Sequence, residues 1–403
     1  MKVKERFLGY VIYPTMSDET SKTVPSTSKQ IEFAHKLADD MKSIGMSDAN
    51  IDKYGYVYGT LKANTDSVSD TIGFIAHMDT SPEASDTNIS PREVKYDGGD
   101  IILNKEKNIV LSPKTYPSLN RYKGQHIIVT DGTTLLGADD KAGAAEIITA
   151  LENIIKGGYR HGTVKVAFTP DEEIGRGADY FDVDGFGADY AYTVDGGALG
   201  ELEYENFNAA SATVKFKGTS IHPGSAKGIM KNACIMAFEF DSMLPQSEVP
   251  SQTEGYEGFH HLLGMEGNVE YAKLSYIIRD HDRAEFERKK QDFIVAADKI
   301  RDKYGNISIE VNISDSYYNM CELIEQNIDI IKYMKEAMLE AGVEPVIQPI
   351  RGGTDGAKLS YRGLLCPNIC TGGENFHSRF EYIPVESMEK TVKIIENTIL
   401  GAK

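Results

Sequence analysis

The sequence lacks the features that mark secreted and membrane-spanning proteins. It contains no run of about 18 apolar residues, the length that a helix needs to cross a membrane, so we expect no membrane span. The first ten residues carry charges, but no apolar segment follows them, and we therefore expect no secretion signal. The hydrophobic fraction of 41% is ordinary for a soluble protein.

Cysteines are also few, and basic residues are fewer than acidic ones. Four cysteines are too few and too scattered for a disulfide framework, and they favour a reducing, cytoplasmic compartment. The 43 lysines and arginines are outnumbered by 61 acids. The resulting net charge of −18 argues against nucleic acid or an anionic membrane surface as the partner.

The length and the order of the periodic segments predict two domains. A chain of 403 residues is too long for a comfortable single core. Residues 208–318 follow the order strand, helix, strand, strand, helix, strand, which is typical of an α+β ferredoxin-like domain. The flanking segments, 1–207 and 319–403, predict an α/β domain with a central mixed sheet flanked by helices. Within it, residues 84–130 are expected to form an irregular insertion with one hairpin.

Ligand-type residues follow several predicted strands at the point where each strand ends. The apolar run Ile72–Ala76 predicts a strand buried on both faces, and it ends at His77 and Asp79. The same pattern recurs before Glu172 with Glu173, before Asp195, and before His377. Because open α/β sheets bind their ligands at the carboxyl ends of the strands, we expect these side chains to meet at one edge.

Asp139 is placed differently, at the start of an alanine-rich helix, where an acid can serve as a cap or as a ligand. Two histidines with three carboxylates are too many for one tetrahedral zinc, and they suit two metals that share a carboxylate. A hydrolase also needs a carboxylate free of metal as general base, and Glu172 fits this role. The predicted ligands are His77, Asp139, Glu173, Asp195 and His377.

Six segments resemble, in the same order, the signature segments of the di-zinc aminoacylase and carboxypeptidase G family, and the likeness covers essentially the whole chain. They are His77-Met-Asp79-Thr, Gly137-Ala-Asp139-Asp140-Lys, Asp171-Glu172-Glu173-Ile-Gly, Val194-Asp195-Gly-Gly, His222-Pro-Gly and His377-Ser.

The resemblance implies a role for each residue of the site. His77 and Asp195 would bind one zinc, Glu173 and His377 would bind the other, and Asp139 would bridge them. Glu172 would be the general base, and Asp79 would orient the ring of His77. The likeness also implies that the peptide bond between Asp139 and Asp140 is cis.

The family likeness further implies an aminopeptidase that hydrolyses tripeptides with two Zn²⁺ per subunit, although Co²⁺ or Mn²⁺ would suit the same ligands. The ferredoxin-like domain would be a lid. His222, which could also be only a turn residue before Pro223, would donate to the oxyanion, and Arg279 would reach the cleft. Arg351 would grip a substrate carboxylate or carbonyl.

Two alternatives stay open at this stage. An N-acyl amino-acid deacylase or a carboxypeptidase would use the same metals and base, so only substrate preference separates these enzymes. A catalytically silent binding protein is less favoured, because binding alone does not need the metal-free carboxylate of Glu172. The expected partners are short peptides, and the chain is expected to be a monomer or a homodimer.

Overall fold

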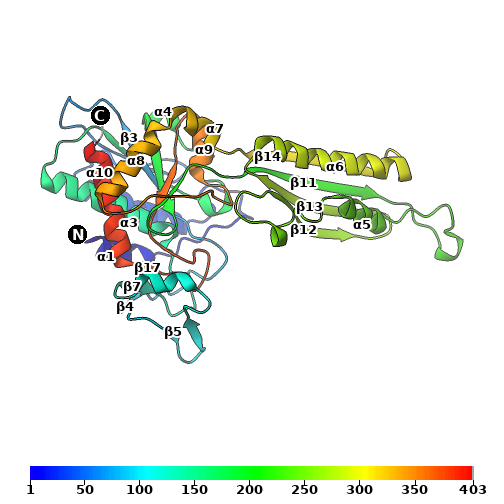
Figure 1. Cartoon of the computed structure of the whole chain (residues 1–403), viewed down its shortest axis with the longest axis horizontal. Coiled ribbons are helices and arrows are strands. Elements are labelled where there is room, and N and C mark those ends of the chain that lie inside the picture. The colour runs from blue at the N-terminus through cyan, green and yellow to red at the C-terminus, as the bar shows by residue number, and fades with distance from the viewer. Residues whose placement is uncertain (402–403) are drawn as a thin grey trace. The chain divides into compact units, whose positions relative to one another are not determined.

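The computed structural model describes residues 1–401, which form two compact units (Figure 1). Unit 1 comprises Met1–Tyr204, Glu322–Gln348 and the chain from Thr354 onward. Unit 2 comprises Glu205–Cys321 together with the short segment Pro349–Gly353. The return of Pro349–Gly353 to unit 2 was not expected from the sequence. None of the helices formed by residues 1–401 is long and apolar enough to cross a membrane.

Unit 1 is built around an eight-stranded mixed sheet, which confirms the predicted α/β class. Its strands, in spatial order, are β1 (Asn50–Ile51), β2 (Val57–Leu61), β8 (Val164–Thr169), β3 (Ile72–His77), β9 (Tyr190–Gly196), β16 (Asn368–Cys370), β10 (Glu201–Glu203) and β15 (Val346–Ile347). The four neighbours β8, β3, β9 and β16 run parallel, so their carboxyl ends share one edge of the sheet. All six residues of β3 are buried, as expected for a strand that is covered on both faces.

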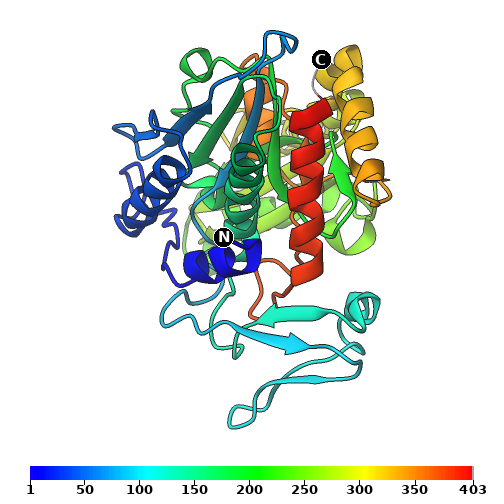
Figure 2. The same cartoon turned by 90° about the vertical axis from the view of Figure 1, so that its left-hand side faces the viewer.

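Helices cover this sheet. They are α1 (Val3–Val11), α2 (Lys29–Ser43), α3 (Ala138–Gly157), α4 (Val183–Phe186), α7 (Cys321–Ile324), α8 (Asp329–Glu340), α9 (Asp355–Tyr361) and α10 (Val385–Gly401). Helix α3 packs against β3 and β9, and α10, drawn in red in Figure 2, lies beside it. The 3-10 turn Glu325–Asn327 separates α7 from α8.

The insertion within residues 84–130 is more regular than expected. Strands β4 (Arg92–Lys95) and β7 (His126–Val129) pair with β17 (Ile383–Pro384) in a three-stranded antiparallel sheet. Strands β5 (Ile101–Asn104) and β6 (Ile109–Leu111) form the expected hairpin. The expectation of an irregular segment was wrong because β7 pairs with a strand from the far end of the chain, and local sequence does not reveal such a partner.

Unit 2 has the ferredoxin-like order that the sequence predicted. Its elements are β11 (Asn208–Lys217), α5 (Ala233–Met243), β12 (Phe259–Gly267), β13 (Tyr271–Asp280), α6 (Arg283–Tyr304) and β14 (Ile309–Tyr317). The strands form an antiparallel sheet in the order β12-β13-β11-β14. Val214, Phe240 and Phe293 belong to one core that joins the sheet to both helices. The limits of the predicted lid domain, 208 and 318, stay predictions.

Candidate metal centre

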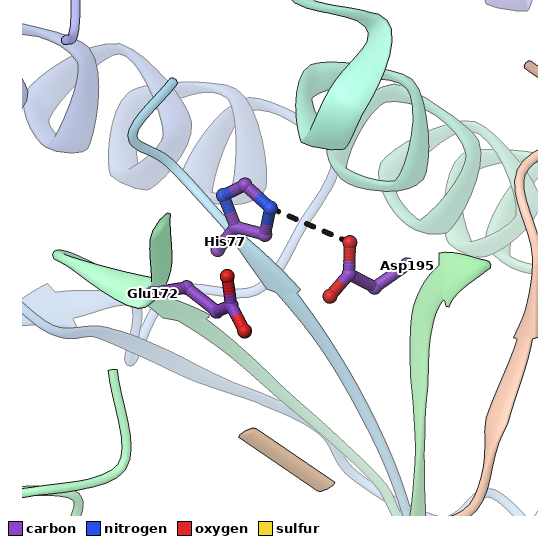
Figure 3. Close-up of side chains that lie close together, drawn as sticks. All are labelled: His77, Glu172 and Asp195. Carbon is purple, nitrogen blue, oxygen red and sulfur yellow. Dashed lines mark ion pairs between the residues drawn. The ribbon is translucent and has the colours of Figure 1, made fainter. Parts of the chain in front are cut away.

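The predicted ligand-type residues of unit 1 gather at the carboxyl edge of its central strands. His77 is the last residue of β3, and Asp195 lies near the end of β9. Glu172 begins a short 3-10 turn just after β8. Figure 3 shows that the side chains of these three residues point toward one another. The neighbouring parallel strands thus bring together residues that lie far apart in the sequence.

The carboxylate of Asp139 lies between the two histidines. Its Oδ1 is 2.8 Å from Nε2 of His77, and its Oδ2 is 3.2 Å from Nε2 of His377. Each histidine also has a carboxylate of its own. Oδ1 of Asp195 is 3.4 Å from Nε2 of His77, and Oε2 of Glu173 is 2.8 Å from Nε2 of His377. The five residues therefore form two pairs with one shared carboxylate.

Asp139 owes its position to an irregular start of α3. Gly137 has a φ of +76°, and neither Asp139 nor Asp140 has helical φ and ψ values. The peptide bond between Asp139 and Asp140 is cis, as the family likeness implied. Because the regular helix starts only after these residues, the side chain of Asp139 is not confined to a helix face.

Glu172 also lies within reach of a metal ion. Ligand atoms of His77, Glu172 and Asp195 lie within 4.8 Å of one another, and so do those of His77, Asp139 and Glu173. By distance alone Glu172 could be a ligand or a metal-free base. Its role as general base stays a prediction.

Asp79 holds the turn that carries Glu172 and Glu173. Its buried carboxylate accepts the backbone N–H of Glu172 at 2.9 Å on one oxygen and that of Glu173 at 3.1 Å on the other. Nδ1 of His77 lies 3.0 Å from the backbone oxygen of Asp79 and 3.5 Å from its carboxylate. The atom of Asp79 nearest to the imidazole is therefore its carbonyl oxygen rather than the side chain expected from the sequence.

Asp171 holds the same turn from the other side, and the sequence analysis assigned it no role. It has a left-handed φ of 61° and is fully buried. Its carboxylate accepts the backbone N–H and the hydroxyl of Ser26 and the side-chain amide of Gln30. The three consecutive acids were the only sequence signal, since the partners of Asp171 come from the segment before and at the start of α2.

The centre carries more acid than its histidines can neutralise. Burial, aided by the charge of Asp139, raises the pKa of Glu173 to about 8. Burial also raises the pKa of Asp195 to about 6 and that of Glu172 well above its usual value. Hydrogen bonds to Asp139 and Glu173 raise the pKa of His377 to about 11. Such a cluster of carboxylates favours a bound cation.

The other predicted site residues, His222, Arg279 and Arg351, belong to unit 2. His222 is exposed, and its Nδ1 accepts the backbone N–H of Gly224 at 3.1 Å. Their roles toward substrate stay predictions.

Both arginines are already engaged within unit 2. Arg279 donates to the backbone oxygens of Ala210 and Ile278 at 3.2 and 2.9 Å. Arg351 donates to the backbone oxygens of Gly255 and Glu257, and its guanidinium carbon lies 5.1 Å from the ring centre of Phe207. A substrate would have to compete with these contacts or use the donors that they leave.

Comparison with known proteins identifies the class. Residues 129–401 match the model of peptidase family M20/M25/M40. The chain is 55% identical over 396 residues to Peptidase T of Halothermothrix orenii, covering 98% of this chain and 97% of the relative. The chain therefore belongs to the M20/M25/M40 peptidase family.

Solved structures of two further proteins share the fold. The aminopeptidase PepT of Bacillus cereus superposes with a TM-score of 0.77 at 22% identity, covering 99% of this chain and 98% of that one. A tripeptidase of Staphylococcus aureus superposes with a TM-score of 0.78 at 21% identity, with the same coverage.

Proposed function

We propose that this peptidase is a tripeptide aminopeptidase with a carboxylate-bridged centre of two zinc ions. One observation carries the proposal: the carboxylate of Asp139 lies between Nε2 of His77 and Nε2 of His377, at 2.8 and 3.2 Å. The names of the relatives, Peptidase T, aminopeptidase and tripeptidase, support the choice of substrate. A content of only four cysteines, too few and too scattered for a disulfide framework, supports a cytoplasmic location.

The residues present fit a pair of metal ions. Two imidazoles and three carboxylates are donors that zinc accepts, and cobalt or manganese would suit them as well. Oε1 of Glu173 is buried and has no hydrogen-bond partner among residues 1–401, so it is available to a cation. His77 and Asp195 would hold one ion, His377 and Glu173 the other, and Asp139 both. When bound, such ions act as Lewis acids toward the peptide carbonyl and lower the pKa of water.

Glu172 would be the general base. Its carboxylate would take a proton from the attacking water and then deliver it to the nitrogen of the departing amine. The hydrogen bond from its own N–H to Asp79 would keep the turn in place during both transfers. The raised pKa of Glu172, caused first by burial, suits a group that must hold a proton between the two transfers.

His222 would donate a hydrogen bond to the oxyanion of the tetrahedral intermediate. Its ring is free to donate through Nε2, because the contact with Gly224 uses Nδ1 as the acceptor. Arg279 and Arg351 would help to bind the substrate.

Comparing a tripeptide with its N-acetylated form tests the substrate proposal. An aminopeptidase requires the free amino terminus, so the acetylated peptide should be hydrolysed far more slowly. A dipeptide and a tetrapeptide of matching sequence test the preference for length. Equal turnover of the free and acetylated tripeptides would overturn the aminopeptidase assignment. Faster turnover of N-acyl amino acids would establish the deacylase alternative.

A further inference from the structure

Glu381 lies four positions after His377, and the reaction proposed above does not use it. Its side chain is 2% exposed, and its carboxylate accepts three backbone N–H groups from one distant turn. Oε2 accepts those of Leu136 and Gly137 at 3.0 and 2.7 Å, and Oε1 accepts that of Asp139 at 3.0 Å. Both oxygens therefore accept hydrogen bonds, and Oε1 accepts one from the main chain of Asp139, the proposed bridging ligand.

The turn that receives this carboxylate has three backbone N–H groups that donate outside the turn. N–H groups at the start of a helix have no partner within the helix and need an outside acceptor. At the start of α3 more N–H groups need an outside acceptor, because Asp139 and Asp140 depart from helical geometry. The carboxylate of Asp140 accepts the N–H of Gly143 at 3.1 Å. Glu381 supplies the acceptor for the N–H of Asp139 from 242 residues further along the chain. The main chain of Asp139 is thus fixed by Glu381.

Glu381 also belongs to the loop that carries His377. Its own N–H donates to the backbone oxygen of Ser378 at 3.0 Å. The loop is closed just beyond it by two hydrogen bonds between the main chains of Glu374 and Tyr382, at 2.9 and 3.1 Å. His377 itself has a φ of 58°, which is uncommon for a residue with a side chain. One carboxylate therefore connects the segment of Asp139 to the segment of His377.

We propose that Glu381 is a positioning residue of the metal centre, which keeps Asp139 and His377 at the separation that two bridged ions require. This inference rests on the proposed two-metal centre. Partners one step removed from the metal commonly change its affinity by about 10–100-fold when they are lost. The loss of Glu381 should therefore weaken metal binding beyond any effect on folding.

The informative substitution is Glu381→Gln, which changes the size of the side chain very little. An amide offers one acceptor oxygen, so its NH₂ group would face either the N–H of Asp139 or those of Leu136 and Gly137. Donor would then oppose donor in a buried site.

Glu152→Gln is the matched control. Glu152 lies on α3, the helix that has Asp139 in its first turn, and is 8% exposed. Its carboxylate accepts a hydrogen bond from Arg6 at 2.8 Å. It is 13 residues from Asp139, or about 20 Å along a helix, so its loss tests the cost of removing a buried carboxylate far from the centre.

The experiment titrates metal-free protein with Co²⁺ and with Zn²⁺ against a competing chromogenic chelator, and records the thermal unfolding of each apoprotein. We expect wild type and Glu152→Gln to bind two ions alike. Glu381→Gln should bind them about 10–100-fold more weakly and change the visible absorption spectrum of the Co²⁺ form.

Wild-type metal affinity and spectrum in Glu381→Gln, with only a lowered Tm, would overturn the inference. Glu381→Asp keeps the charge but shortens the side chain by one methylene, and it is judged by the same titration if the glutamine variant does not fold. Wild-type protein that binds no pair of ions would overturn the proposed centre itself, and with it this inference.

Discussion

The backbone N–H of Glu172 donates a hydrogen bond of 2.9 Å to the carboxylate of Asp79. The two residues follow neighbouring parallel strands, β8 and β3, so the bond ties the ends of both strands together. The other oxygen of Asp79 accepts the N–H of Glu173 at 3.1 Å. The proposed base and its neighbouring ligand are therefore positioned through their main chain, and their carboxylates take no part in this anchoring.

Replacing Glu172 by alanine tests the division between base and ligand. If Glu172 is the base, metal content should stay near the wild-type value while kcat falls by about 10²–10⁴-fold, as is typical when a general base is lost. Metal analysis of the purified variant together with steady-state kinetics on a tripeptide gives both numbers. Loss of an ion would instead make Glu172 a ligand, which its place within 4.8 Å of the ligand atoms of His77 and Asp195 would allow.

Replacing Asp79 by asparagine tests whether its carboxylate holds the turn that carries Glu172 and Glu173. The amide can accept only one of the two N–H groups that the carboxylate accepts, and the other is left unsatisfied in a buried site. We expect a loss of about 1–3 kcal/mol in the free energy of unfolding, together with a lower kcat. Asp131→Asn is the control, because Asp131 accepts the N–H of Thr133 at 2.9 Å just after β7 and is neither a proposed ligand nor the proposed base. Wild-type kinetics in Asp79→Asn would show that the turn does not need this anchor.

The contact between Asp171 and Ser26 can be measured with a double-mutant cycle. Asp171→Asn keeps a residue that tolerates the left-handed backbone, and Ser26→Ala removes one donor. Because the two side chains touch, their effects on the free energy of unfolding in urea should be non-additive by about 0.5–3 kcal/mol. Additive effects would mean that the hydroxyl of Ser26 does not help to hold the turn.

His222 can be tested without disturbing its own turn. His222→Asn keeps a side chain that can cap the N–H of Gly224 but removes the imidazole, whereas His222→Ala removes both. If the ring donates to the oxyanion, both variants should lower kcat by a similar factor, of about 10²-fold or more, with metal content unchanged. Recovery of the wild-type rate in His222→Asn would return His222 to the role of a turn residue.

The elements that carry the site could be predicted because their signals are local. An apolar run that ends in His77, and another that ends in Asp195, reveal buried parallel strands, and the fold places the ends of such strands together. The ferredoxin-like order of unit 2 was visible for the same reason, since its alternating strands and its helices are long. Asp139 was recognisable as a ligand only in combination with the ligand-type residues that follow the strands, because an acid at the start of a helix can also be a cap.

The residues that hold the site in place were not predicted, because their hydrogen-bond partners lie far away in the sequence. Asp171 and Glu381 act through backbone N–H groups, and residue type does not show which carboxylate will meet which N–H. Asp79 was expected to hold the ring of His77 with its side chain, yet that side chain lies closer to the N–H groups of Glu172 and Glu173 in the turn after β8. Long-range pairing also hid the sheet formed by β4, β7 and β17, and the return of Pro349–Gly353 to unit 2.

Stepwise return of metal to the apoprotein tests the central claim most directly. Zn²⁺ or Co²⁺ is added in known amounts while tripeptide hydrolysis and bound metal are measured in the same samples. The account predicts that binding stops at two ions per chain and that full activity on the free tripeptide requires both, with little activity on its N-acetylated form. Full activity with one ion or without added metal, or equal activity on the acetylated peptide, would contradict it.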